Sequence, residues 1–195
     1  TTGIFSSSGA STRSIAFGTG NIILDGAATL TTVLSMANAT NFTYTGTGGF
    51  TSPMSVDRTF SFGSTSGGTS TNAPNLLLTS GASIPTLTTS SWFNNLNFTG
   101  STCTPAIATI NVSVLTLATG GTYTNLSPAL TSTQTWTPQF SKQLGGFGVN
   151  GTGITVTLGG SQSLIATSTT TLTAGTLNLN GYDLTTGIFS SSGTN

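Results

Sequence analysis

The sequence has 195 residues, only 3% of them charged, and its three cations balance its three acidic residues. Nucleic-acid binding needs a basic stripe that releases counterions from phosphates, and three scattered cations exclude it. No apolar run approaches the roughly 18 residues of a transmembrane helix, so we expect no membrane insertion. The charged residues are Arg13, Asp25, Asp57, Arg58, Lys142 and Asp183.

Short strand-like runs fill the first half of the chain, each bounded by Gly, Asn, Ser or Thr. Apolar and polar residues alternate within residues 14–24, 41–46, 58–63 and 95–100. Alternation over about four to eight residues predicts half-buried strands whose apolar side chains face inward. Residues 26–40 are the best candidate for a helix, but they are rich in Thr and lack charged pairs, so we predict none there.

The second half of the chain continues the same pattern. Its apolar phase shifts between Val114 and Leu115, which predicts a bulge or a corner at that point. Later runs alternate again, and the last of them turns at Asn180-Gly181. We therefore predict an all-β chain throughout.

One stretch of sequence occurs twice. Residues 1–9 and residues 185–193 both read TTGIFSSSG. Composition alone does not explain such a repeat at opposite ends of the chain. We interpret 1–184 as one long-period repeat unit and 185–195 as the start of the next. The serines, Ser6 to Ser8 and Ser190 to Ser192, are then equivalent polar corners of successive repeats.

Two architectures fit these strands. A β-solenoid (parallel β-helix) continues past its own ends by stacking, and its stacked Asn, Thr and Ser side chains satisfy one another without charge. At about 20 to 25 residues per coil, the repeat unit would hold roughly eight coils. We favour this fold. A β-sandwich repeat domain would also show a long period and stays the alternative.

Residues 175–193, read on into residues 12–24, resemble the Ser/Thr/Gly-rich repeat units of very large β-solenoid surface proteins of the fibre and adhesin type. Related units occur in phage fibres and in predicted adhesins. The resemblance implies a right-handed parallel β-helix with a structural or adhesive role. It brings no catalytic residues with it, and the rest of the chain is similar only in character.

The sequence contains few residues that could support catalysis or bind a metal ion. Glycoside hydrolysis needs two carboxylates about 5 to 10 Å apart, and the spacing of Asp25, Asp57 and Asp183 does not argue for such a pair. Without His or a second Cys, triads and imidazole or thiolate metal sites are closed. Residues 145–148, with Lys142 nearby, indicate a tight corner rather than a phosphate cradle. We predict no catalytic, cofactor-binding or metal-binding residues.

Aromatic and hydroxyl side chains are the remaining binding candidates. Trp92, Trp136 and Phe93 could stack on sugars, although core packing is the commoner role of large aromatics. Cys103 is expected to be a small buried hydrophobe. Thr-x-Thr pairs could order water on a flat face, but their intervals are irregular, and we interpret them as the wet side of strands. The pairs are Thr43/Thr45, Thr86/Thr88, Thr122/Thr124, Thr133/Thr135, Thr155/Thr157 and Thr171/Thr173.

These observations predict a non-enzymatic structural protein that forms an extracellular filament or an adhesin stalk. Its expected partners are further copies of itself, with a cell-surface glycan as a candidate, and its expected place is the cell or virion surface. A viral tail or capsid fibre that binds a receptor is one alternative. A carbohydrate-active β-helix enzyme is the other.

Overall fold

The computed structural model shows an all-β chain. It describes residues 1–7, 11–27, 29, 32–36, 42–62, 73–79, 85–87, 91–98, 109–117, 122–137 and 144–192, with backbone only at Phe42 and Phe62. Every regular element in these residues is a strand. Thr32–Met36 forms strand β4 inside the segment that came closest to a helical pattern. The prediction of no helix is therefore confirmed for the described part of that segment.

The strands are short and separated by turns, as the Gly- and Asn-bounded apolar runs predict. In chain order they are β1 (Phe5–Ser7), β2 (Arg13–Gly18), β3 (Asn21–Ile23), β4 (Thr32–Met36), β5 (Phe42–Gly46), β6 (Gly49–Ser52), β7 (Arg58–Phe62), β8 (Asn75–Leu78), β9 (Pro85–Leu87), β10 (Trp92–Asn97), β11 (Thr109–Thr116), β12 (Ser127–Leu130), β13 (Gln134–Trp136), β14 (Phe147–Leu158), β15 (Gln162–Ser163), β16 (Thr169–Asn178), β17 (Leu184–Thr185) and β18 (Ile188–Ser191).

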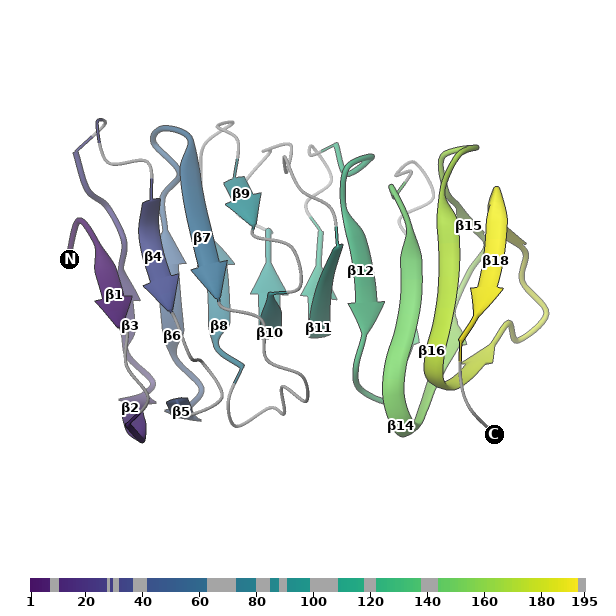
Figure 1. Ribbon diagram of the computed structural model, residues 1–195, viewed down its shortest axis with the longest axis horizontal. Helices are drawn as coiled ribbons and strands as arrows, with labels where there is room; N and C mark the ends of the chain where they lie inside the picture. The colour runs from purple at the N-terminus through teal and green to yellow at the C-terminus, as the bar shows by residue number, and fades with distance from the viewer. Residues whose placement is uncertain are drawn as a thin grey trace.

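The described strands pair in parallel and wind into a β-solenoid. The main sheet has the order β18-β16-β14-β12-β11-β10-β8-β6-β3, with β13 also paired to β14. Smaller sheets have the orders β1-β4-β7-β9, β2-β5 and β15-β17. The coils stack along the long axis, so the two termini lie at opposite ends of the molecule (Figure 1). The predicted solenoid is confirmed, and the β-sandwich alternative is wrong because its strands would be antiparallel.

The coils differ in length along the axis. Near the N-terminus, Ile22 pairs with Phe50, and this pairing spans a longer stretch of chain than the pairing of Ile110 with Pro128 near the middle. The longer coils carry additional strands, such as β2 and β5. The described residues support about five turns, where the sequence predicts roughly eight coils. The N-terminal coils are longer, and the middle coils shorter, than the uniform coil that the sequence-based prediction assumes.

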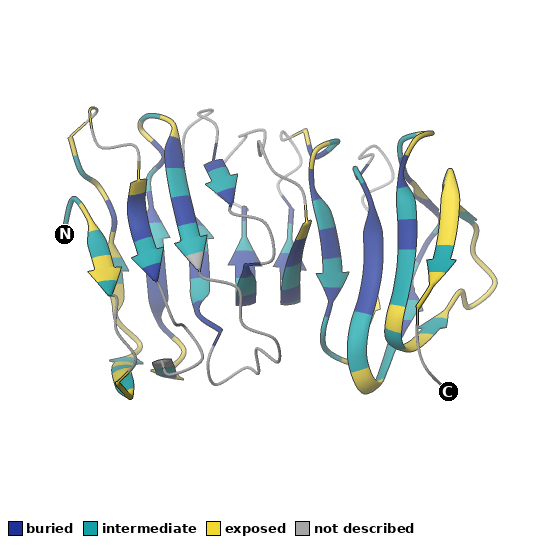
Figure 2. Ribbon diagram, viewed as in Figure 1, coloured by how far each residue is buried: buried dark blue, intermediate teal, exposed yellow. Residues whose placement is uncertain are grey.

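Apolar side chains stack in columns inside the solenoid. Phe50, Leu76, Leu96 and Leu115 lie opposite one another on successive strands, and none of them is more than 8% exposed. Successive side chains of a strand point to opposite faces, so the alternating runs place their apolar members in this core. Figure 2 shows the outcome, because the middle strands are mostly buried while β1 and β18, at the two ends, are not.

Corners and turns lie where the sequence predicts them. Val114 is 45% exposed and Leu115 only 8%, so the predicted change of apolar phase is a corner between the inside and the outside. The preceding coil bends at the same place, since Asn95 lies opposite Val114. Asn180 and Gly181 have φ angles of 52° and 80°, the left-handed values of a tight turn. The predicted turn is confirmed.

Polar side chains form hydrogen bonds from coil to coil. Asn21 Oδ1 accepts a 3.0 Å bond from the backbone of Gly49, and Asn75 Nδ2 donates a 2.9 Å bond to the Gly48 carbonyl. Asn94 Nδ2 in turn donates to Asn75 Oδ1 at 3.0 Å. Neutral amides can stack in this way at the spacing of neighbouring strands, where like charges would repel. The predicted amide ladder is confirmed, and it accounts for a chain with so few charges.

Replacing Gly48 with Ala should destabilise the N-terminal coils. A Cβ atom at Gly48 would lie 1.7 Å from the Gly20 carbonyl oxygen, a backbone atom that cannot move away without shifting its coil. We expect a loss of about 3 kcal/mol in the free energy of unfolding, measured by urea denaturation. Gly20→Ala is the matched control, because its Cβ would come no closer than 3.4 Å to its nearest neighbour. Equal losses in both variants would contradict this account.

Candidate functional site at the two ends of the solenoid

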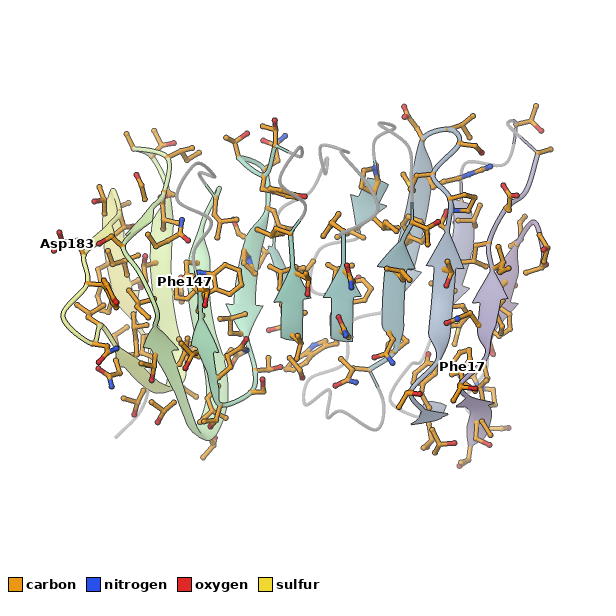
Figure 3. All side chains as sticks on the ribbon, turned by 180° about the vertical axis from the view of Figure 1, so that it is seen from behind. Phe17, Phe147 and Asp183 are labelled. Atoms are coloured by element: carbon orange, nitrogen blue, oxygen red, sulfur yellow. The ribbon has the colours of Figure 1, made fainter. Side chains whose placement is uncertain are left out.

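The acidic residues do not converge on a shared site. Asp25 follows β3 and Asp57 precedes β7, and both are exposed. Asp183 lies at the opposite end of the molecule (Figure 3). Among the described residues, no group of three or more His, Cys, Asp or Glu side chains could hold a metal ion. Cys103, which was predicted to be buried, and Lys142, next to the predicted tight corner, lie outside the described residues.

The three aromatic candidates for sugar binding separate into two environments. Phe93 is fully buried and Trp136 is only 5% exposed, so both belong to the core. Trp136 Nε1 also donates a 3.2 Å hydrogen bond to Gln162 Oε1 inside the solenoid. Trp92 is half-buried, on the strand face opposite to Phe93. Core packing is therefore confirmed for two of the three, and Trp92 alone stays at the surface.

The Thr-x-Thr pairs align on two neighbouring coils. Thr135 lies opposite Thr157, and the backbone N–H of Thr155 donates a 3.1 Å bond to Thr133 Oγ1. Thr171 instead lies opposite Gly148. The irregular sequence intervals thus conceal one short ladder, which sits on the outer side of β13 and β14.

Both copies of the TTGIFSSSG motif adopt the same local structure. Thr2 Oγ1 donates a 2.9 Å bond to the Ile4 carbonyl, and Thr186 Oγ1 donates a 2.9 Å bond to the Ile188 carbonyl. In each copy the chain bends at a glycine and then enters a strand, β1 or β18. The serines after the Phe therefore lie at matching places in the two copies, but Ser6, Ser7, Ser190 and Ser191 are strand residues, and Ser192 directly follows β18. The predicted corner is wrong for them, because the bend falls at the glycine instead.

The two copies stand at opposite ends and use opposite sides of their backbone. β1 is the first strand of its sheet and pairs with β4, the strand of the following coil. β18 is the last strand of the main sheet and pairs with β16, the strand of the preceding coil. The two strands lie at the left and right ends of the molecule, on the near side in Figure 1. Each end of the solenoid therefore presents a strand edge of identical sequence.

The apolar core runs open to both ends. At the N-terminal end the half-buried side chains that pack on the core include Phe5, Ile15, Phe17 and Ile22, and at the C-terminal end they include Leu172, Leu177 and Leu184. Side chains in equivalent columns of the middle coils are fully buried. The end faces are thus cross-sections of the core with coils on one side only.

Phe189 shows how the core is exposed at the C-terminal end. It lies opposite Thr170, which lies opposite Phe147, so the three share one inward-facing column. Phe147 is 2% exposed and Thr170 is 1% exposed, whereas Phe189 is 57% exposed. Phe147 lies on β14, with β16 and β18 between it and the C-terminal end of the main sheet (Figure 3). Position in the stack, and not side-chain direction, explains the exposure of Phe189.

Aromatic rings close the N-terminal end more completely. The Phe5 ring lies 5.2 Å from the Phe50 ring, and the Phe17 ring lies 5.4 Å from it at an interplanar angle of 81°. Tyr44 packs on the same rings, 6.3 Å from Phe17. These separations and tilts are those of favourable aromatic pairs. At the N-terminal end, Phe5 is therefore covered by the following coil, whereas Phe189 at the C-terminal end has no following coil to cover it.

Tyr44 should make the N-terminal end sensitive to alkali. Burial raises the pKa of its hydroxyl, and the positive charge of Arg13 offsets only part of that effect. A Tyr side chain in the unfolded chain ionises at about pH 10. The free energy of unfolding that depends on neutral Tyr44 is therefore fully present below that pH and is lost as the pH rises above it. We expect Tyr44→Phe to lose less unfolding free energy than the native chain between pH 8 and pH 11. The same alkaline loss in both chains would contradict a role for Tyr44.

A scan against protein-family models, a search of curated proteins and a search of solved structures found no match to this chain. Among the described residues, no helix is long and apolar enough to cross a membrane.

Proposed function

We propose that this chain is a non-enzymatic structural protein whose solenoid units stack end to end into an extracellular filament or adhesin stalk. The observation that carries the proposal is the open core: apolar columns end in half-exposed side chains, and both ends present strand edges with the same sequence. Bare strand edges and exposed apolar patches draw in another protein surface. The surface that fits best is the other end of the same unit.

The rest of the molecule supports a mechanical role. Parallel strands about 4.8 Å apart form a hydrogen-bonded ladder along the long axis, which resists bending and stretching. This ladder is reinforced by the hydrogen bonds that the side-chain amides of Asn21, Asn75 and Asn94 form with neighbouring coils. A neutral surface rich in hydroxyl groups also limits nonspecific ionic contacts. These are properties of a stiff and inert rod.

Both alternatives lack a specific observation in their favour. Polysaccharide cleavage would need paired carboxylates on one face, and Asp183 lies far along the axis from Asp25 and Asp57. A receptor-binding viral fibre would share the same solenoid, and its attachment to a particle would be visible only in the assembled virion. We therefore argue the filament alone.

The 195-residue chain should assemble reversibly as its concentration rises. Sedimentation velocity and negative-stain electron microscopy are expected to show elongated particles that lengthen with concentration. Phe189→Asp should reduce assembly at least tenfold, since it places a charge on the exposed end of a buried column. The matched control is Thr133→Asp, which places the same charge on an exposed lateral residue. A chain that stays monomeric at high concentration, or equal effects of both variants, would overturn the proposal.

A further inference from the structure

We propose that assembly occurs by strand replacement, in which residues 185–191 of one copy take the place of residues 1–7 of a second copy of the same chain. This inference rests on the proposed end-to-end assembly and specifies its geometry. One copy of the motif would then serve as the last strand of one unit and the first strand of the next. The displaced residues 1–7 would be released from their coil.

The backbone bonds of the two motif copies do not compete with one another. The Thr185 carbonyl accepts a 3.0 Å bond from Leu164 of the preceding coil. Thr2, the equivalent of Thr186, donates a 2.8 Å bond to the Ile23 carbonyl of the following coil and accepts one from Asp25 at 3.1 Å. Adjacent residues of the motif thus use opposite edges. A single strand of this sequence can make both sets of bonds at once, as every inner strand of a solenoid does.

The side chains are compatible with the same replacement. Phe5 packs on Phe50 of the following coil, and Phe189 ends the column of Thr170 from the preceding coil. Since the two motif copies are identical, Phe189 of one chain can occupy the place of Phe5 in another without any change of contacts. It would then be covered on both sides. The copies contain no charged residue that such a stack would bury.

The exchange is nearly neutral for the receiving coil and favourable for the end faces. Residues Phe5 to Ser7 contact β4 at Leu34 to Met36, and the incoming strand restores each of these pairs. The gain comes from covering the exposed Phe189 and the half-buried side chains that pack on the core at this end. Exchange of identical elements between chains is a low-cost route to assembly. The alternative keeps both strands and stacks β18 against β1 as two separate rungs.

Two single substitutions separate these geometries by the sign of their effect. Strand replacement makes the motif copies competitors for one place, so Phe5→Ala should strengthen assembly, by about tenfold in the association constant. Phe189→Ala should weaken assembly by about tenfold or more, because the incoming strand loses its anchor. If β18 instead stacks against an intact β1, both substitutions weaken assembly. Light scattering against concentration measures the association constants for the 195-residue chains.

A labelled peptide of sequence TTGIFSSSG gives a second measurement on the native chain. Strand replacement predicts that the peptide binds, that it slows assembly, and that it binds Phe5→Ala more tightly than the native chain. A scrambled peptide of the same composition is the control. A weaker assembly of Phe5→Ala, with that variant still folded by circular dichroism, overturns strand replacement but leaves stacking intact. A native chain that does not assemble at all overturns both proposals.

Discussion

Replacing Arg58 with Met is expected to lower the free energy of unfolding by about 3 kcal/mol. Arg58 is only 2% exposed, and it points into the solenoid at the start of β7. Its guanidinium donates hydrogen bonds of 2.6 Å to the Gly26 carbonyl and 3.1 Å to the Ala27 carbonyl, both on the segment after β3. Met fills a similar volume but donates nothing. Both carbonyls then lose a charged donor, and the guanidinium's hydrogen bonds are worth more than the packing that Met restores.

The matched control for that change is Arg13→Met. Arg13 is half-buried. Its guanidinium donates hydrogen bonds to the Ser11 carbonyl, at 3.2 Å, and to Ser7 Oγ, and both partners lie close to Arg13 in the sequence. Water can replace these partners, so we expect a loss below about 1 kcal/mol. Urea denaturation followed by circular dichroism measures both variants. Similar losses for the two arginines would show that the carbonyl bonds of Arg58 contribute little.

The fold class could be predicted because it rests on local patterns and on one repeat. Alternation in runs such as residues 58–62 specifies strands whose Phe60 lies inside, and Phe60 is fully buried. The repeated motif favoured a fold that can be extended by stacking, as a solenoid can. Few charges and many amides were consistent with ladders between coils. None of this required knowledge of which strand pairs with which.

Coil length and corner position could not be predicted, because they depend on pairing over long range. The phase shift at Val114 and Leu115 is visible in the sequence, since two apolar residues adjoin. The same corner in the preceding coil falls at Asn95, where no second apolar residue adjoins Leu96 to mark it. Turns without an apolar signature leave the count of coils open. A prediction from the sequence therefore has to assume a uniform coil length, because the strand pairing that sets the true lengths is not known.

The candidate assembly surface was only half predictable for a related reason. The two motif copies directed attention to both ends of the chain, where the structure places strands β1 and β18. The exposure of Phe189 and the burial of Phe5 against Phe50 cannot be inferred from identical letters. They arise from which neighbouring coil is present. The burial of Arg58 could not be predicted either, because the sequence does not show that its guanidinium donates to the carbonyls of Gly26 and Ala27.

Trp92 and Phe93 adjoin in the sequence, and their substitutions should differ most clearly. Phe93→Ala is expected to lower the free energy of unfolding by about 3 to 5 kcal/mol, because the ring is fully buried in the middle of the stack. Its strand β10 pairs with both β8 and β11, so the resulting cavity weakens coils on both sides.

Trp92→Ala is the matched control on the same strand. Trp92 is half-buried on the outer face, and its loss should cost about 1 kcal/mol while the coils stay packed. Urea denaturation of both variants, at equal protein concentration below the threshold of assembly, compares them directly. The core would be misplaced if Trp92→Ala proved the more damaging change. In that event the outer face of β10, and not its inner face, would hold the solenoid together.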